Sequence, residues 1–217
     1  MNAASSHEPQ GRDARPAGPG SSMDGGNSIR AVALGASTGA VEALLRLLPG
    51  LPANYPLPLL IVVHLPVDAE STLATLLASR CRIAVKEAED KEPIRPGVAY
   101  LAPANYHLLV EPDFHLSLSS DEPVLFSRPS IDVLFESAAD AYGSGLAGIV
   151  LTGANADGAR GLQAICAAGG VGLVQAPAAA QAGAMPQAAL DLCPSARAAE
   201  LAELAAILSD GKFPPTP

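Results

Sequence analysis

Apolar residues in this chain fall in short runs that alternate with stretches of helical spacing. Unbroken apolar runs predict strands that are covered on both faces, at residues 31–34, 59–63, 146–151 and 171–174. Shorter patterns predict further strands at residues 83–86 and 98–102. Apolar residues that recur every three or four positions predict helices at residues 41–48, 69–79, 131–142, 158–168 and 196–208. This alternation indicates a doubly wound, mainly parallel α/β sheet with a three-layer α/β/α architecture.

One part of the pattern departs from the alternation. Residues 108–111 and 115–119 have the pattern of two short strands, and the Pro112-Asp113 pair between them is typical of a turn. We therefore expect an antiparallel hairpin attached to the parallel sheet. After this hairpin, Ser130 is the expected N-cap of the helix that begins at residue 131.

The two ends of the chain lack a core-forming pattern. Residues 1–28 are rich in Gly, Ser, Pro and Ala, which predicts a disordered tail, and residues 211–217 predict a frayed C-terminus. Hydrophobic residues make up 49% of the 217 residues, which is enough for a sizeable core. We therefore expect one folded domain over residues 29–210.

Charge and composition disfavour several classes of partner and cofactor. The chain has 13 Lys and Arg against 22 Asp and Glu, a net charge of −9 that repels nucleic acid and anionic lipid surfaces. Its three cysteines are widely spaced without a CxxC pair, so we expect neither a disulfide framework nor a metal site, and no cofactor motif is present. The longest apolar run is too short for membrane insertion, and the N-terminus has no signal-like region, which predicts a cytoplasmic protein.

The first predicted strand leads into a candidate nucleophile. Gly35-Ala36-Ser37-Thr38-Gly39 fits the pattern G-x-S-x-G between a strand and a helix, which holds a serine hydroxyl on a sharp turn. A helix N-terminus next to it favours a developing oxyanion. The alternative is a simple N-cap serine in a glycine turn.

Two further polar residues follow predicted strands. His64 comes directly after the second strand and suits the role of general base, although a histidine satisfied by backbone groups is the alternative. Asp157 lies in the loop after the strand at residues 146–151 and suits the third position of a triad, with a helix N-cap as the alternative. The carboxyl ends of parallel strands meet at one edge, which favours the joint interpretation. The order Ser, His, Asp differs from that of the α/β-hydrolases.

Several segments of the sequence resemble those of one known family, the catalytic domain of the chemotaxis receptor methylesterases (CheB). The resemblance covers about residues 29 to 208 and rests on blocks in family order: Gly35-Ala36-Ser37-Thr38-Gly39, His64, Val85–Asp90, Pro96–Pro103, Arg128–Phe135, Leu151-Thr152-Gly153 and Asp157-Gly158-Ala159. It implies a Rossmann-like parallel sheet with an antiparallel hairpin. It also implies hydrolysis of glutamyl methyl esters on chemoreceptors to glutamate and methanol, with deamidation of receptor glutamines as a further activity.

The resemblance assigns roles to individual positions. It implies that Ser37 is the nucleophile, His64 the general base and acid, and Asp157 the orienting carboxylate, with the backbone amides of Thr38 and Ala154 as oxyanion donors. The loop departs from the family at the methionine and second glycine, where this chain has Ala154 and Asn155. We expect two residues of the sequence to line the substrate cleft: Asn155 and Met185.

The resemblance also suggests partners. The expected substrate is a methylated chemoreceptor or a similar signalling protein. Family members commonly begin with a receiver domain, whereas only a short tail precedes Ile29 here, so we expect regulation by a separate protein rather than by phosphorylation of the chain itself. Two other hypotheses remain open: an esterase or amidase with a substrate other than a chemoreceptor, and a catalytically silent docking module.

Overall fold

The computed structural model describes Met1, residues 28–64 and residues 70–214. The tail expected over residues 1–28 therefore lies almost entirely outside the described residues, and so do the last three residues of the expected frayed C-terminus. Within the described part no helix is long and apolar enough to cross a membrane.

A seven-stranded parallel sheet forms the centre of the described structure, in the order β3-β4-β2-β1-β7-β8-β9. Its strands are β1 (Ala31–Ala36), β2 (Leu59–Val63), β3 (Ala84–Glu87), β4 (Val98–Leu101), β7 (Leu146–Val150), β8 (Val171–Gln175) and β9 (Arg197–Ala199). The central strand β1 lies between β2 on one side and β7 on the other. Strand order reverses at this position, and such a reversal opens a crevice beyond the carboxyl ends of the strands.

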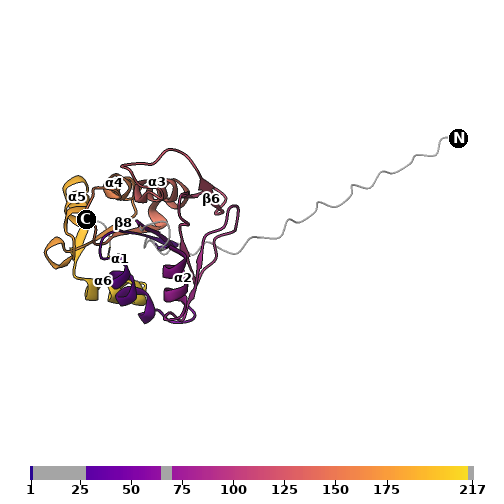
Figure 1. Cartoon of the computed structure of the whole chain (residues 1–217). Helices are drawn as coiled ribbons and strands as arrows, with labels where there is room; N and C mark the ends of the chain where they lie inside the picture. The colour runs from indigo at the N-terminus through magenta and orange to yellow at the C-terminus, as the bar shows by residue number, and fades with distance from the viewer. Residues whose placement is uncertain (2–27, 65–69, 215–217) are drawn as a thin grey trace.

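Helices cover both faces of the sheet (Figure 1). One layer contains α1 (Ala40–Leu47), α2 (Glu70–Ala78) and α6 (Leu201–Asp210), and the other contains α3 (Ile131–Tyr142), α4 (Ala159–Ala167) and α5 (Ala184–Leu192). Along β1, Val32 and Leu34 pack in the first core, whereas Ala31 and Ala33 pack in the second. Because both faces are buried, the strand has no polar alternation. The expected three-layer α/β fold is confirmed.

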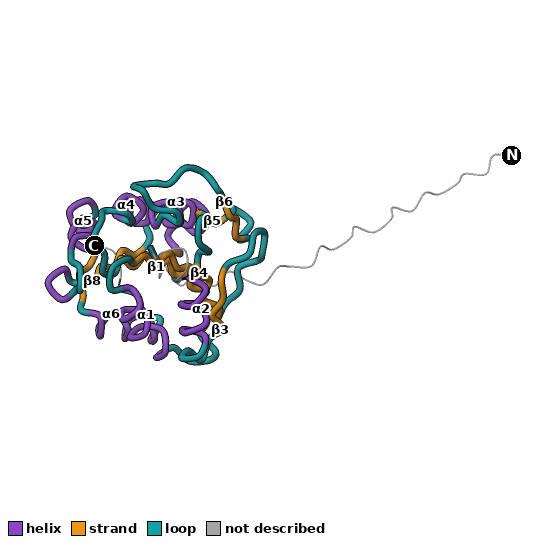
Figure 2. Tube along the Cα trace, viewed as in Figure 1, coloured by secondary structure: helices purple, strands orange, loops and turns teal. Residues whose placement is uncertain are grey.

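The expected hairpin is also present. Strands β5 (His107–Val110) and β6 (Leu116–Ser119) pair antiparallel in a separate two-stranded sheet beside α3 (Figure 2). The backbone N–H of Val110 donates to Ser137 Oγ of α3 at 3.1 Å. The hairpin thus packs on the α3 side of the molecule, away from α1.

The pattern was wrong about the last helix. Residues 197–199 form the edge strand β9, which pairs with β8, and α6 begins only at Leu201. A three-residue strand is too short to give a periodic signal, and its pairing with β8 overrides the helical propensity of its alanines. Helix α5 was not predicted either, because it is only nine residues long and contains Pro186 near its start.

Candidate active site

The three residues singled out from the sequence lie at one edge of the sheet. Ser37 follows β1, His64 follows β2, and Asp157 lies in the loop after β7. Backbone hydrogen bonds join these loops: Ser37 N–H donates to Thr152 O at 2.9 Å, and His64 N–H donates to Ala36 O at 3.1 Å. The site therefore lies where strand order reverses.

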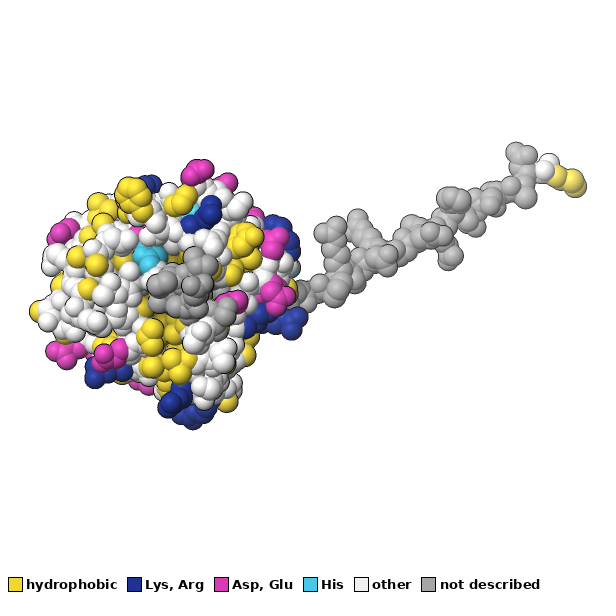
Figure 3. All heavy atoms as spheres, in the orientation of Figure 1, with side chains coloured by type: hydrophobic (Ala, Val, Ile, Leu, Met, Phe, Trp, Pro, Cys, Tyr) yellow, Lys and Arg dark blue, Asp and Glu magenta, His cyan; other side chains and the backbone are white. Residues whose placement is uncertain are grey.

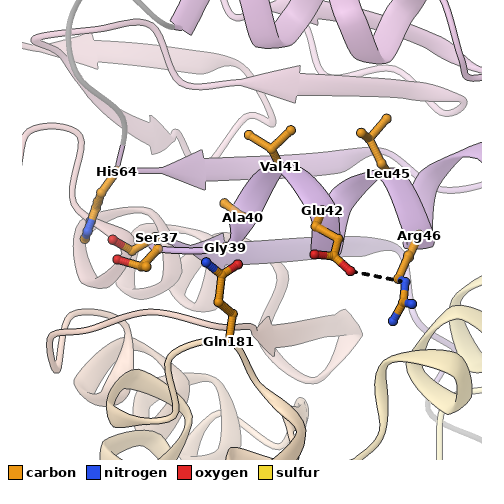
Figure 4. A pocket seen from close by; sticks show the side chains of 10 residues that line it. Ser37, Gly39, Ala40, Val41, Glu42, Leu45, Arg46, His64 and Gln181 are labelled. Carbon is orange, nitrogen blue, oxygen red and sulfur yellow. Dashed lines mark ion pairs between the residues drawn. The ribbon is translucent and has the colours of Figure 1, made fainter.

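A direct hydrogen bond joins the histidine to the carboxylate. His64 Nε2 lies 2.8 Å from Asp157 Oδ2. The His64 side chain is 13% exposed, whereas that of Asp157 is fully buried. Because Nε2 is hydrogen-bonded to Asp157, Nδ1 is the ring nitrogen that remains for the hydroxyl of Ser37. Figure 4 shows His64 and Ser37 at the same end of a pocket.

The serine–histidine contact is looser than the histidine–aspartate contact. Among the hydrogen bonds of the described residues, none joins Ser37 Oγ to His64. Nucleophile–base contacts are often long in sites without substrate and tighten when it binds.

The carboxylate of Asp157 is held at the N-terminus of α3. Its Oδ1 accepts from Ser130 Oγ at 2.8 Å and from Asp132 N–H at 3.0 Å, and its Oδ2 accepts from Ile131 N–H at 2.7 Å as well as from His64. The backbone N–H groups of a first helical turn have no partner within the helix, so this carboxylate caps α3. Ser130 was expected to be the cap; it occupies the N-cap position, but its hydroxyl makes no cap bond and donates to Asp157 instead.

These contacts decide the charge state of Asp157. Burial alone would raise its pKa, but the hydrogen bond from His64, the backbone N–H groups of Asp132 and Ile131, and the His64 charge together hold the pKa below its usual value. Asp157 is therefore an ionised acceptor at neutral pH, and it requires a proton on Nε2 of His64. That arrangement leaves Nδ1 free to accept a proton.

A second buried acid makes the reciprocal contact. Asp132, in the first turn of α3, is 2% exposed and accepts through Oδ1 from the N–H groups of Gly158 and Gly161, at 2.9 Å and 2.8 Å. Helices α3 and α4 thus cap each other, each with an aspartate from the other segment. Burial raises the pKa of Asp132, and the nearby charge of Asp157 adds to this, while the N–H of Gly161 opposes it. Oδ2 of Asp132 is buried without a partner among the described residues.

A buried histidine of the hairpin supports the same helix start. His107 is 2% exposed; its Nδ1 accepts from Ser130 N–H at 3.1 Å, so its Nε2–H donates to Glu122 O at 3.1 Å. Sequence reasoning assigned no role to His107, and it missed the contacts of Asp132. Besides the expected N-cap at Ser130, the Arg128–Phe135 block of the family resemblance was the signal for this region.

The two expected oxyanion donors are available. Among the described residues, neither the N–H of Thr38 nor that of Ala154 donates a hydrogen bond, and both residues are exposed. Between Thr38 and α1, Gly39 has φ 88°, a left-handed conformation that favours glycine. A Cβ at Gly39 would lie 2.7 Å from Gln181 Oε1.

The two residues expected in the cleft, Asn155 and Met185, have other contacts in the structure. Asn155 Oδ1 accepts from Asp157 N–H at 3.2 Å, so its side chain shapes the loop. Met185 is fully buried, and its side chain packs directly under Gly153. Neither residue lines the pocket that contains Ser37.

The pocket at Ser37 extends along α1. It has a volume of about 630 Å³ and its lining residues are Ser37, Thr38, Gly39, Ala40, Val41, Glu42, Leu45, Arg46, His64 and Gln181. Val41 and Leu45 belong to the apolar pattern that predicted this helix, but the fully buried residues of α1 are Ala40, Ala43, Leu44 and Leu47, and Leu45 is only partly buried against the core. Val41 is 39% exposed. Among the described residues, no group of three or more His, Cys, Asp or Glu side chains has the arrangement of a metal site.

A serine, a histidine and a buried, ionised aspartate beyond the strands of a parallel sheet are the components of a serine hydrolase. The family model described as CheB methylesterase matches residues 32–208. The crystal structure of the Thermotoga maritima CheB methylesterase catalytic domain superposes with a TM-score of 0.80 and 28% identity, over 84% of this chain and 98% of that one. The chain therefore belongs to the CheB methylesterase family.

Proteins with similar sequences have names that agree with this family. A putative protein-glutamate methylesterase/protein-glutamine glutaminase of Leptospira interrogans is 44% identical over 164 residues, which are 76% of this chain and 85% of that protein. A protein-glutamate methylesterase/protein-glutamine glutaminase of Bradyrhizobium diazoefficiens is 46% identical over 136 residues, which are 61% of this chain but only 37% of that protein.

Proposed function

We propose that this chain hydrolyses the methyl esters of glutamate side chains on a chemoreceptor or a similar signalling protein. Membership of the CheB methylesterase family supports the reaction, and the names of the relatives support the substrate class. The single observation that carries the proposal is the 2.8 Å hydrogen bond between His64 Nε2 and the buried Asp157, at the end of the pocket that contains Ser37.

In the proposed reaction Ser37 attacks the ester carbonyl. His64 takes the hydroxyl proton on Nδ1, and the negative charge of Asp157 stabilises the imidazolium through the Nε2–H bond. The free N–H groups of Thr38 and Ala154 donate hydrogen bonds to the oxyanion of the tetrahedral intermediate. His64 then returns the proton to the leaving methoxide, which departs as methanol and leaves an acyl-serine.

Water completes the cycle. His64 removes a proton from a water molecule, which attacks the acyl-serine. The second tetrahedral intermediate then collapses to glutamate as His64 gives the proton to the leaving Oγ of Ser37. A glutamine side chain follows the same path with ammonia as the leaving group, which accounts for the glutaminase in the relatives' names. The amide needs a protonated leaving nitrogen, so it depends more strongly on His64 acting as acid.

The experiment is methanol release from a methylated receptor fragment by the purified chain. We expect release by the wild type and loss of release in Ser37→Ala. Ser144→Ala is the matched control, because Ser144 is exposed and precedes β7 at the opposite edge of the sheet. Equal release by wild type and Ser37→Ala would contradict the assignment of the nucleophile. Specific binding of the fragment without release would favour the silent docking module.

A further inference from the structure

The pocket at Ser37 is larger than its proposed chemistry requires. A cavity of about 150 Å³ already holds a benzene molecule, which is larger than a methyl ester group. The pocket here measures about 630 Å³, and its lining continues from Ser37 and His64 along α1 to Arg46. Figure 4 shows Val41, Leu45 and Arg46 following one another along α1, away from Ser37 and His64.

This face of α1 has two apolar side chains that also line the pocket. Val41 and Leu45 are one turn apart; Val41 is 39% exposed, whereas Leu45 is partly buried and packs against the core. Hydrophobic side chains gather on the surface over α1 and α2 (Figure 3). An apolar strip continuous with an active-site pocket marks a surface that contacts the rest of a substrate.

A charged pair completes the strip. Arg46 Nε lies 3.7 Å from Glu42 Oε1, and both side chains are more than 60% exposed, at 66% and 69%. An exposed pair one turn apart on a helix is worth only a few tenths of a kcal/mol, so it exchanges easily for another partner. In a chain of net charge −9, Arg46 offers local attraction to an acidic residue of an approaching protein.

A helix can place one side chain at Ser37 and others along α1. With its side chains an α-helix is about 10–12 Å wide, so we expect the ester-bearing side chain to reach Ser37 while the helix body lies beside α1. Arg46 lies six positions after Ala40, a rise of about 9 Å along α1. A substrate helix beside α1 presents residues about three or four and about seven positions from the ester over the same span.

We propose that the outward face of α1, formed by Val41, Leu45 and Arg46, docks the helix that carries the methylated glutamate. The face selects helices with an apolar residue three or four positions from the ester and an acidic residue about seven positions from it. The inference rests on the proposed function, because the positions along the substrate helix are counted from the ester at Ser37.

The test compares two substrates. One is a helical peptide with a glutamate methyl ester, Leu four positions away and Glu seven positions away; the other is a small N-acyl glutamate methyl ester without a helix. The readout is the ratio of kcat/KM for the peptide to kcat/KM for the small ester, which cancels effects on the chemical step. For Arg46→Glu we expect this ratio to fall about tenfold, since attraction becomes repulsion. Lys in place of Glu in the peptide should restore it.

Arg160→Glu is the matched control. Arg160 is 69% exposed and pairs with Glu136 at 3.3 Å, much as Arg46 pairs with Glu42, but it lies on α4 on the other face of the sheet. We expect the ratio of wild type for this variant. An equal fall in both variants, or no rescue by the Lys peptide, would overturn the docking surface.

A second variant tests the apolar part of the face. Val41→Thr keeps the side-chain shape at an exposed position, so the fold is retained, and we expect the peptide ratio to fall about threefold for one lost apolar contact.

A wild type that hydrolyses the small ester without preferring the peptide would refute the docking surface alone. Hydrolysis of neither substrate would refute the proposed function with it. Concentration-dependent dimerisation lost in Val41→Thr would assign the face to a second copy and overturn the proposal.

Discussion

Asp157 and Asp132 each cap the start of the other's helix segment, but we expect the same Asp→Asn substitution to destabilise the protein at Asp157 and not at Asp132. In Asp157→Asn, the amide supplies one acceptor oxygen where the carboxylate supplied two, and each carboxylate oxygen accepts one backbone N–H. Whichever way the amide is turned, its NH₂ group faces the N–H of either Ile131 or Asp132. In Asp132→Asn, the amide oxygen can keep the bonds from Gly158 and Gly161, and NH₂ replaces an oxygen that has no partner among the described residues.

The magnitudes follow from the number of bonds lost. A buried N–H without an acceptor costs about 1–3 kcal/mol, and exchanging a charged for a neutral acceptor at the remaining bonds costs about 1 kcal/mol more. We expect Asp157→Asn to lose about 2–4 kcal/mol of unfolding free energy and Asp132→Asn to stay within about 1 kcal/mol of wild type. Without the charge of Asp157, the proposed imidazolium of His64 is destabilised, and kcat should fall on the order of 10³-fold or more.

Urea unfolding followed by circular dichroism measures the stabilities, with equal m-values required for the comparison. Methanol release measures kcat. Ser37→Ala provides the control for activity lost without stability, because the Ser37 hydroxyl has no hydrogen bond to another described residue. If Asp157→Asn retained wild-type stability, or if the two asparagine variants lost equal stability, the capping exchange would be refuted. The stability result stands independently of any substrate.

Three further outcomes follow from other contacts. Gly35→Ala should lose about 1–3 kcal/mol of unfolding free energy, because its Cβ would lie 2.3 Å from Ile131 Cγ2, whereas Gly50→Ala, with no neighbour within 4 Å, should be nearly neutral in the same urea titration. Tyr55→Phe should cost about 1 kcal/mol in thermal unfolding, since the buried hydroxyl donates to a carbonyl of α6 at 2.9 Å; wild-type stability would contradict that contact. Folding lowers the pKa of Asp157, so the contribution of Asp157 to the unfolding free energy is fully present above the unfolded pKa of about 3.9 and is lost as pH falls through the folded pKa. The stability difference between wild type and Asp157→Ala should therefore shrink below about pH 4.

Local patterns predicted most of the fold. Uninterrupted apolar runs defined β1, β2, β7 and β8 to within two residues, because burial on both faces leaves a signal inside each strand. The pattern failed at β9 and α5, which depend on pairing and packing with distant segments. The residue-level positions of Ser37, His64 and Asp157 followed from the rule that strand ends meet at one edge.

The supporting contacts could not be predicted in the same way. Asp157 and Ser130 are 27 residues apart. Ser130 was expected to cap the helix that follows it, and for Asp157 the same kind of cap was the alternative to its role in the triad. Each assignment was locally reasonable, but an N-cap can also come from a distant segment that brings an oxygen to the helix start. Only the packing of α3 against α4 decides that Asp157 caps α3 and Asp132 caps α4. Likewise, Val41 and Leu45 have helical spacing, but spacing alone does not say which face meets the sheet.

The contact between His64 Nε2 and Asp157 has a consequence for covalent labelling. Nδ1 is the ring nitrogen adjacent to Cγ, so the nitrogen that Asp157 leaves free lies close to the main chain after β2, while Nε2 is covered by a buried carboxylate. An electrophile that enters the pocket and alkylates the imidazole should therefore give the Nδ1 adduct. The Nδ1 and Nε2 adducts of histidine have the same mass but different nitrogen chemical shifts, so nitrogen-15 spectra of labelled protein would distinguish them. The orientation of one ring thus determines which inhibitor geometry this pocket accepts.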